Sequence, residues 1–409
     1  YCGADPTAKS LHVGNLVPLL AMLHFGIRGH DMIGLVGGAT VEVGDPSGRA
    51  TERTKMEDGV RLSNEEKISL QMKKILENAI AYAKRRGFTN IGKLTMANNA
   101  DWWKQISFLG FMDTVGRHLR VQEMLKRQSV QSRIESEAGI GYNEFTYQAM
   151  QAYDFFHLHH TLGCRVQVGG SDQYGNIISG VDLTARLQHA KGLPKLATYG
   201  VTTPLLTTTT GEKLGKSAGN AVWLDPELTS PFALYQYFVR IPDADVEKYL
   251  KILTLMPLAE IAAVVEAHAK DESLRVGQHA LAKEVTDMIH GDGAGDRARV
   301  QSSILFAAPN QGVEYDADTI IDAFEGDSQL KHFTASEILG QRLMQVIKLV
   351  DSRSGKAIKE LIAGGGVYAG PKLERITDVK TVVSEDLLID GRLLLLRLGK
   401  ANMRLIALQ

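Results

Sequence analysis

Short apolar runs alternate with helical patterns between residue 1 and about residue 220. The run DMIGLVGG, residues 31–38, has the composition of a buried strand that ends in glycines, and CRVQVGG, residues 164–170, has the same character. The run LVPLLAMLHF is apolar on nearly every side and fits a buried helix, which Pro18 requires to start near Gly14. Because strands that alternate with helices tend to pair in parallel, this part of the chain predicts a parallel α/β sheet.

Helical patterns dominate the middle of the chain. A long helix is expected from Ser63, where Ser63 and Glu66 match a capping box, to Gly87. From Asp225 to about His290 the pattern is helical with short turns. The segment GDGAGDRARV that follows is expected to be an exposed loop, and the C-terminal part reads as a basic helix, a glycine turn, a short strand and a hairpin.

Composition and charge point to one end of the chain. With 409 residues, 44% of them hydrophobic, the chain can form two or three domains. Its 46 basic and 47 acidic side chains nearly cancel, but residues 340–409 contain 12 Lys/Arg against 7 Asp/Glu. A basic C-terminal module on an acidic body indicates a nucleic-acid contact, with ordinary surface variation as the alternative.

Cysteine count and hydropathy limit the class of protein. Cys2 and Cys164 form neither a disulfide framework nor a zinc pattern, which favours a reducing compartment. No apolar run reaches the roughly 18 residues of a membrane span, so we expect no membrane partner. The opening YCGADPT reads as the inside of a strand and a turn, and we expect further residues before it.

Two lysines stand three residues apart in GEKLGKSAGN, residues 211–220, which follows four threonines. A P-loop would need a glycine separated by four residues from Gly215, and Thr210 occupies that position. The segment is therefore a lysine-bearing loop of another kind.

A second candidate segment, DPTAKSLHVGN, directly precedes the apolar helix. The N–H groups and the positive dipole end of that helix would face a ligand here, and Gly3 and Gly14 would allow close approach to the backbone. His12 could donate to phosphate oxygens. Taken alone, His12 is more simply a histidine that caps an element.

Together these segments resemble a known family. HVGN followed by KLGKS resembles the HIGH and KMSKS motifs of class I aminoacyl-tRNA synthetases. With GDPSG, YQAMQAYDF, QVGGSDQYGN and KLGKSAGNAVWL, the chain is similar along its whole length to tyrosyl-tRNA synthetases of the bacterial and mitochondrial type, most of all to fungal mitochondrial members. The resemblance implies a Rossmann-like α/β catalytic domain that activates L-tyrosine with ATP, accompanied by Mg²⁺, and transfers it to tRNA(Tyr).

In that reaction the tyrosine carboxylate attacks the α-phosphate and pyrophosphate leaves, so catalysis depends on positioning and on well-placed cations. The resemblance assigns phosphate and pyrophosphate contacts to the residues Thr7, His12, Asn15, Arg49, Arg53, Lys213, Lys216 and Ser217. It assigns ATP contacts to Cys2, Gly3, Asp5, Gly14, Gly170, Asp172 and Gln173. No metal ligands are expected among the side chains.

The tyrosine pocket is expected on one helix. Tyr147, Gln151 and Asp154 have i, i+4, i+7 spacing and share a helix face, where three polar groups suit a pocket wall better than a core. The resemblance implies that Asp154 and Tyr1 bond the substrate hydroxyl. It implies that Asp45, Tyr147 and Gln151 hold the ammonium group, with Gln167 close by.

The resemblance also divides the chain. It implies a catalytic domain over residues 1–221, with a dimer and acceptor-stem region near 100–145, an α-helical anticodon-side domain over 222–335, and a small α+β RNA-binding domain over 340–409 that is similar to a ribosomal-protein fold. Arg353, Lys356 and Lys359 would face RNA phosphates. The implied assembly is a homodimer in the mitochondrial matrix, with the bacterial cytoplasm as the alternative location.

Three alternatives stay open at this point. A tryptophanyl-tRNA synthetase shares the fold, but an indole offers only a donor to Asp154 and Tyr1. A noncatalytic RNA-binding protein on a synthetase scaffold would not need intact HVGN and KLGKS. A second role in group I intron splicing, through contact with the intron RNA, is known for some fungal mitochondrial relatives.

Overall fold

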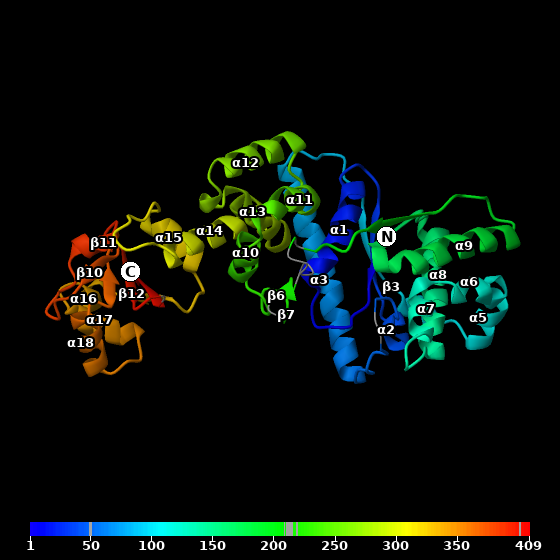
Figure 1. Cartoon of the computed structure of the whole chain (residues 1–409), viewed down its shortest axis with the longest axis horizontal. Coiled ribbons are helices and arrows are strands. Elements are labelled where there is room, and N and C mark those ends of the chain that lie inside the picture. Colours follow the sequence, from blue (N-terminus) through cyan, green and yellow to red (C-terminus); the bar gives the residue numbers. More distant parts are fainter. Residues whose placement is uncertain (49–50, 208, 210–215, 218–219, 401) are drawn as a thin grey trace. The chain divides into compact units, whose positions relative to one another are not determined.

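The structure is a computed structural model that describes residues 1–48, 51–207, 209, 216–217, 220–400 and 402–409. The chain forms two compact units, one of residues 1–230 and 237–292 and the other of residues 231–236 and 293–409 (Figure 1). The division into three domains inferred from the sequence stays a prediction.

The first unit contains a five-stranded parallel sheet with the order β3-β2-β1-β4-β5. Its strands are β1 (Cys2–Ala4), β2 (Met32–Val36), β3 (Leu94–Asn98), β4 (Val166–Gly170) and β5 (Tyr199–Thr203). Strand β1 pairs with β2 on one side and with β4 on the other, so the strand order reverses at β1. In open α/β sheets ligands bind at such a reversal, outside the carboxyl ends of the strands. The predicted parallel sheet is confirmed.

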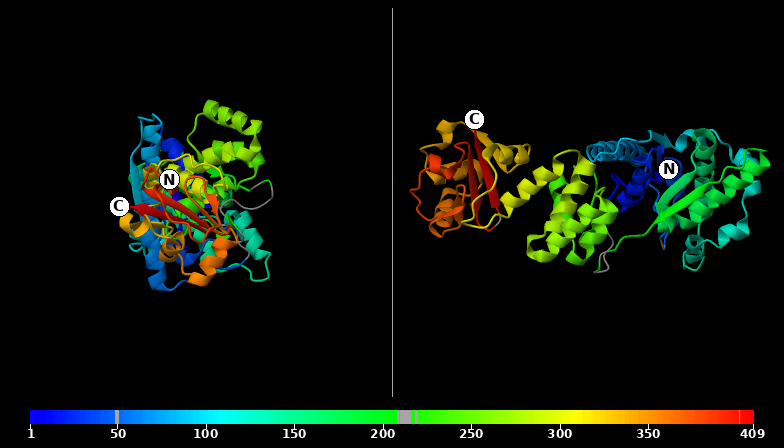
Figure 2. Two further views of the ribbon diagram at one scale, coloured as in Figure 1. Left: turned by 90° about the vertical axis from the view of Figure 1, so that its left-hand side faces the viewer. Right: turned by 90° about the horizontal axis from the view of Figure 1, so that it is seen from above.

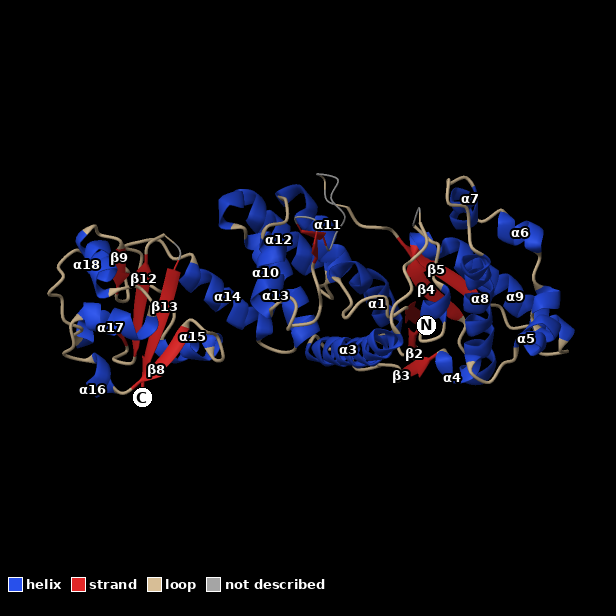
Figure 3. Ribbon diagram, turned by 90° about the horizontal axis from the view of Figure 1, so that it is seen from below, coloured by secondary structure: helices blue, strands red, loops and turns tan. Residues whose placement is uncertain are grey.

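Long helices cover both faces of this sheet (Figure 3). They are α1 (Val13–Gly26), α3 (Asp58–Arg85), α8 (Tyr142–Leu162) and α9 (Tyr174–Ala190). A side chain at Gly34 would meet Met72 of α3, whereas its neighbour Leu35 packs with Phe155 of α8. Because side chains along a strand alternate between faces, α3 and α8 lie on opposite faces.

Two helices, α3 and α1, begin at other residues than the sequence predicts. Helix α3 begins at Asp58, so the start predicted at Ser63 is wrong. The added first turn is held by Arg61, which pairs with Glu42 at 3.0 Å and with Glu65 at 3.7 Å. Helix α1 begins at Val13, one residue from the prediction, and Pro18 falls in its second turn, where it removes one helix hydrogen bond.

Shorter helices complete the first unit. Before α8 and at the start of α9 they are α2 (Thr40–Val43), α4 (Ala100–Trp103), α5 (Phe108–Thr114), η1 (Gly116–His118), α6 (Val121–Leu125), α7 (Gln128–Ile134) and η2 (Ser171–Gln173). Towards its end they are α11 (Asp243–Leu253), α12 (Leu258–Lys270), η3 (Glu272–Leu274) and α13 (Val276–His290), while α10 (Pro231–Val239) belongs partly to each unit. The predicted helical region from Asp225 to His290 is confirmed.

The second unit is a sheet with helices on both faces. Strand order is β10-β9-β12-β13-β8, with β11 beside β12, and the two longest strands, β12 and β13, lie in its middle (Figure 2). The strands are β8 (Leu330–Phe333), β9 (Val367–Ala369), β10 (Glu374–Ile376), β11 (Leu388–Ile389), β12 (Leu393–Leu398) and β13 (Asn402–Leu408). The helices are α14 (Ala294–Leu305), α15 (Ala317–Phe324), α16 (Ala335–Ile338), α17 (Leu343–Val350), α18 (Gly355–Ala363) and η4 (Glu385–Leu387).

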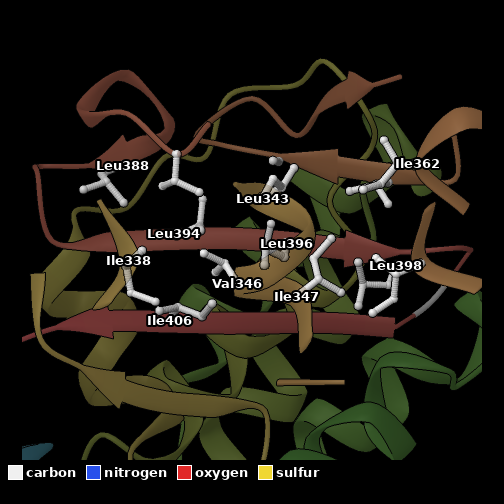
Figure 4. Packing of buried hydrophobic residues seen from close by; sticks show 14 of the residues in the cluster. Ile338, Leu343, Val346, Ile347, Ile362, Leu388, Leu394, Leu396, Leu398 and Ile406 are labelled. Carbon is white, nitrogen blue, oxygen red and sulfur yellow. The ribbon is translucent and has the colours of Figure 1, made fainter. Parts of the chain in front are cut away.

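Burial on both faces explains the unbroken apolar run of β12. Leu394 and Leu396 pack with Ile347 and Ile362 on one face (Figure 4), and Leu395 packs into the cluster on the other. The segment GDGAGDRARV is mostly helix α14, not a loop, because Gly293 ends the turn at a φ of 73° and a buried stripe follows. Of the helices in the described part of the chain, none combines the length and hydropathy needed to cross a bilayer.

Candidate active site

A cleft of about 490 Å³ opens in the first unit at the reversal of strand order. Its walls come from the residues that follow β1, β2 and β4 and from the face of α8. The predicted site residues that line it are Tyr1, Cys2, Gly3, Asp5, Thr7, His12, Gly14, Asn15, Asp45, Arg53, Tyr147, Gln151, Asp154, Gln167, Gly170, Asp172 and Gln173. Segments distant in the sequence therefore meet in one cleft, while the role of each residue stays a prediction.

The lysine segment adjoins this cleft through the residues that follow it. Arg49 and Lys213 lie outside the described residues, and Lys216 and Ser217 form the two-residue strand β6 (Lys216–Ser217), which pairs with β7 (Asn220–Ala221). Just beyond β7, the backbone N–H of Val13 donates to the carbonyl of Val222 at 3.0 Å. No pattern in the sequence indicated this backbone pairing between the segment after the lysines and the HVGN segment.

A buried carboxylate with three donors lines the cleft. Asp154 is 2% exposed. Its Oδ1 accepts from the indole N–H groups of Trp102 at 2.8 Å and Trp103 at 2.7 Å, and its Oδ2 accepts from Asn99 at 3.0 Å. Burial raises the pKa of Asp154 to about 6, and the three hydrogen bonds act in the opposite direction. One lone pair of Oδ2 thus remains for a ligand.

Sequence reasoning missed Asn99, Trp102 and Trp103. They follow β3 in the stretch NNADWW, and two adjacent tryptophans after an asparagine pair were the available signal. Recognising it would have required placing β3 in the sheet, because only then does this stretch reach α8.

Three side-chain oxygens in the cleft are buried without a partner among the described residues, as is Nε of Arg53. The oxygens are Oη of Tyr1, Oε1 of Gln151 and Oε1 of Gln167. A buried polar atom without a hydrogen bond costs about 1–3 kcal/mol, so such atoms mark a place where a ligand completes the bonding. The ring of Tyr1 packs edge-on against Phe155, which fixes its hydroxyl in the wall.

Two further carboxylates, those of Asp5 and Asp45, line the cleft. Asp5 accepts from Thr40 at 2.7 Å and from the Tyr147 hydroxyl at 2.9 Å, and Asp45 accepts from Gln173 at 2.7 Å. Burial raises the pKa of Asp5 to about 7, and the nearby charge of Asp45 adds to the rise. Hydrogen bonds from Thr40 and Tyr147 oppose it. Thr40 is another site neighbour that sequence reasoning missed.

The three basic residues predicted to meet RNA lie in the second unit. Lys356 and Lys359 lie on the exposed side of α18, whereas Arg353 precedes the helix, which begins at Gly355 with Ser354 as its N-cap. Arg353 lies 3.6 Å from Asp351. The expected single basic helix face is therefore two lysines on a helix with an arginine just before it.

The fold and cleft together define a class I aminoacyl-tRNA synthetase: a parallel sheet whose strand order reverses at a cleft that the HVGN segment lines. A family model described as "tRNA synthetases class I (W and Y)" matches residues 1–307. The mitochondrial tyrosine–tRNA ligase of Saccharomyces cerevisiae is 45% identical over 98% of this chain and 80% of its own. The tyrosine–tRNA ligase of Opitutus terrae is 41% identical over 98% of this chain and 90% of its own.

A solved structure agrees with these relatives. The C-terminally truncated mitochondrial tyrosyl-tRNA synthetase of Aspergillus nidulans superimposes with a TM-score of 0.69 at 39% identity, over 75% of this chain and 85% of that one. This chain belongs to the class I tyrosyl-tRNA synthetase family, and its activity is that of a tyrosine–tRNA ligase.

Proposed function

We propose that the protein activates L-tyrosine with ATP to tyrosyl-adenylate and transfers the tyrosyl group to tRNA(Tyr) in mitochondrial translation, in the matrix. The observation that carries the proposal is the set of unpartnered polar atoms of Tyr1, Gln151 and Gln167 around Asp154, in a cleft that the HVGN segment also lines. Its mitochondrial setting is supported by relatives such as the yeast mitochondrial enzyme.

In the proposed reaction a tyrosine carboxylate oxygen forms a bond to the α-phosphorus as the bond from that phosphorus to the bridging oxygen breaks. The nucleophile is already ionised, so no general base is needed. Negative charge builds on the departing pyrophosphate, and cations placed there lower the barrier. Arg53, which lines the cleft, is one such cation, and Arg49, Lys213 and Lys216 are proposed from the sequence.

The substrate groups match the cleft in chemistry. Asp154 and the Tyr1 hydroxyl would bond the phenol, and Asp45, Tyr147 and Gln151 would hold the ammonium group. The phenol hydroxyl both donates and accepts, which suits a carboxylate beside a hydroxyl. An indole only donates, so tryptophan would leave one of these groups unpaired. The tryptophan alternative is therefore not favoured, and the similarity to tyrosine–tRNA ligases over nearly the whole chain does not favour a noncatalytic protein.

Magnesium enters with ATP in this proposal. No three His, Cys, Asp or Glu side chains gather as a metal site in the described parts of the chain. We propose that the cation is carried by the phosphate oxygens, as is usual for Mg²⁺ with nucleotides.

The proposed homodimer is supported by apolar side chains that the single chain leaves exposed. Phe108 and Leu109 of α5 are 65% and 78% exposed, Val121 of α6 is 59% exposed, and Tyr142 at the start of α8 is 66% exposed. We propose that these side chains belong to one apolar patch that a second copy of the chain covers. For tRNA(Tyr) we propose a contact with Lys356 and Lys359. Splicing of group I introns stays a prediction, and competition between tRNA(Tyr) and an intron RNA would test it.

Replacing Lys216 with alanine is expected to slow tyrosine-dependent exchange of pyrophosphate into ATP about 100-fold while the dissociation constant of tyrosine changes less than twofold, because the lysine is proposed to act on the departing pyrophosphate. Rapid-quench kinetics would measure the rate of exchange, and equilibrium dialysis would measure the dissociation constant of tyrosine. Lys195→Ala, at an exposed lysine between α9 and β5, is the control. A wild-type chain without tyrosine-dependent exchange would refute the proposed function, and a collapse of tyrosine binding in Lys216→Ala would refute the role of the lysine.

Tyrosine binding is expected to weaken as the pH falls through about 6, because protonation of Asp154 removes the charge that accepts from the phenol. The stability of the free protein should respond in the opposite sense. The pKa values of Asp154 and Asp5 are raised above the ordinary aspartate value, so the folded state holds protons that the unfolded state has lost between about pH 4 and 7. The contribution of these two bound protons to the free energy of unfolding is therefore lost as the pH rises through this window. Measuring the dissociation constant of tyrosine and the free energy of urea unfolding from pH 5 to 8 would show both trends. If affinity and stability changed with pH in the same direction, the raised pKa values of Asp154 and Asp5 would be contradicted.

A further inference from the structure

The SDQYGN segment contains an asparagine that the proposed reaction does not use. Asn176 lies in the first turn of α9 and is 3% exposed. It does not line the cleft. Asn176 therefore lies behind the cleft wall, and its amide faces residues that line the cleft.

The amide of Asn176 makes two hydrogen bonds towards the cleft. Its Nδ2 donates to Oε1 of Gln173 at 3.1 Å and to Oγ of Ser47 at 3.4 Å. Gln173 and Asn176 are three residues apart, a spacing that brings side chains together at the start of a helix.

The first of these bonds decides which way the Gln173 amide points. With Oε1 facing the Asn176 donor, Nε2 of Gln173 faces the acids and donates to Asp45 at 2.7 Å and to Asp172 at 3.3 Å. A reversed amide would turn its Oε1 towards both carboxylates, where like partial charges repel. Asn176 and Asp45 thus select the same orientation from opposite sides.

Asp45 depends on this arrangement. Its Oδ2 accepts from Gln173, and its Oδ1 accepts from the backbone N–H of Ser47 at 2.9 Å, the residue whose hydroxyl also bonds Asn176. Both oxygens of the carboxylate are therefore held by residues that Asn176 contacts.

We propose that Asn176 is a positioning residue, which fixes the amide of Gln173 and through it places Asp45 for the tyrosine ammonium group. The inference rests on the proposed function, because it takes Asp45 to be the acid that meets the ammonium. Loss of the Asn176 amide frees Gln173 to rotate, and the Asp45 carboxylate loses a fixed donor. The effect falls mainly on tyrosine, because Asp45 is the acid that meets its ammonium group, whereas Gln173 is one of seven residues to which the resemblance assigns an ATP contact.

The test is a double-mutant cycle in the full chain, read by tyrosine-dependent pyrophosphate exchange. Asn176→Ala is expected to raise KM for tyrosine about tenfold, equivalent to about 1.4 kcal/mol, and to change KM for ATP less than twofold. In a Gln173→Ala background the same replacement is expected to add less than twofold, because the amide that it orients is gone.

Ser179→Ala is the matched control. Ser179 lies one turn further along α9 and is also buried, and its hydroxyl donates to the backbone carbonyl of Gly175 at 2.9 Å. It is expected to alter KM for tyrosine less than twofold. Thermal unfolding of each variant shows whether it is folded. Should Asn176→Ala not fold, Asn176→Ser, whose hydroxyl is one atom too short to reach Gln173, replaces it.

Two results would overturn the proposal: a full tenfold effect of Asn176→Ala in the Gln173→Ala background, or equal rises of KM for tyrosine and ATP. Absence of exchange in the wild-type chain would instead refute the proposed function itself, so the two failures are distinguishable.

Discussion

Replacing Gly37 with alanine is expected to lower kcat/KM for tyrosine about 100-fold. The added Cβ would lie 1.9 Å from Oδ1 of Asp5 and 2.5 Å from Oγ1 of Thr40, far inside van der Waals contact. Asp5 must move, and with it the hydrogen bond from Tyr147. A displacement of about 1 Å in a catalytic site can cost about 10²-fold in rate. Tyrosine-dependent pyrophosphate exchange would measure the loss.

Gly59→Ala is the control for this prediction. Gly59 lies in the first turn of α3, and a Cβ there would meet nothing within 4 Å. The replacement is expected to leave exchange unchanged and to stabilise the helix by up to about 1 kcal/mol. If Gly37→Ala retained wild-type exchange, the arrangement of Asp5, Thr40 and Tyr147 described above would be unnecessary for activity.

Replacing Arg133 with alanine is expected to lower the free energy of unfolding by about 3–5 kcal/mol, because it leaves the Glu144 carboxylate buried without its partner. The two side chains are 2% and 3% exposed. They form a bidentate ion pair, in which Nη1 and Nη2 of Arg133 donate to Oε1 and Oε2 of Glu144 at 2.6 and 2.8 Å. Arg133 also donates to the carbonyl of Gly139 at 2.9 Å, so it ties α7 and the turn after it to the start of α8. Urea unfolding followed by circular dichroism would measure the change.

A second ion pair nearby supplies the comparison. Arg117 and Asp113 approach to 2.6 Å, but their side chains are 72% and 65% exposed. Exposed pairs contribute about 0–1 kcal/mol, so Arg117→Ala is expected to have little effect on unfolding. Equal losses for the two arginine variants would show that burial does not set the strength of the Arg133 contact.

The central strands could be predicted from the sequence and the edge strands could not. Strands β2 and β4 are covered on both faces, so selection for burial leaves apolar runs that end in glycines. Strand β3 lies at the edge of the sheet with every residue only half-buried, and β5 at the other edge is mostly exposed. Partial burial leaves no such run, and both strands went unpredicted.

The same distinction applies to the cleft. Residues such as His12 and Asp154 were predicted as site residues because they lie in short sequence motifs that resemble those of a known family. Asn99 and Asn176 act through other side chains, and their importance depends on distances that only the folded chain defines. Helix α14 was wrongly predicted as a loop for a related reason. Glycines and aspartates interrupt its sequence pattern, although Ala298, Val300 and Ile304 form a stripe that is buried in the second unit.

Strand β1 is the middle member of its sheet although it comes first among the five. Cys2 pairs with Gly34 nearby in the sequence but also with Val168 far along it. During synthesis, the first-made strand must therefore wait, with one edge open, until the chain has emerged well beyond α8. Contacts between such remote segments form slowly, because the long intervening loop must close first. The catalytic cavity thus cannot form before β4 has been made, and a prematurely terminated chain that stops before β4 cannot acquire it at all.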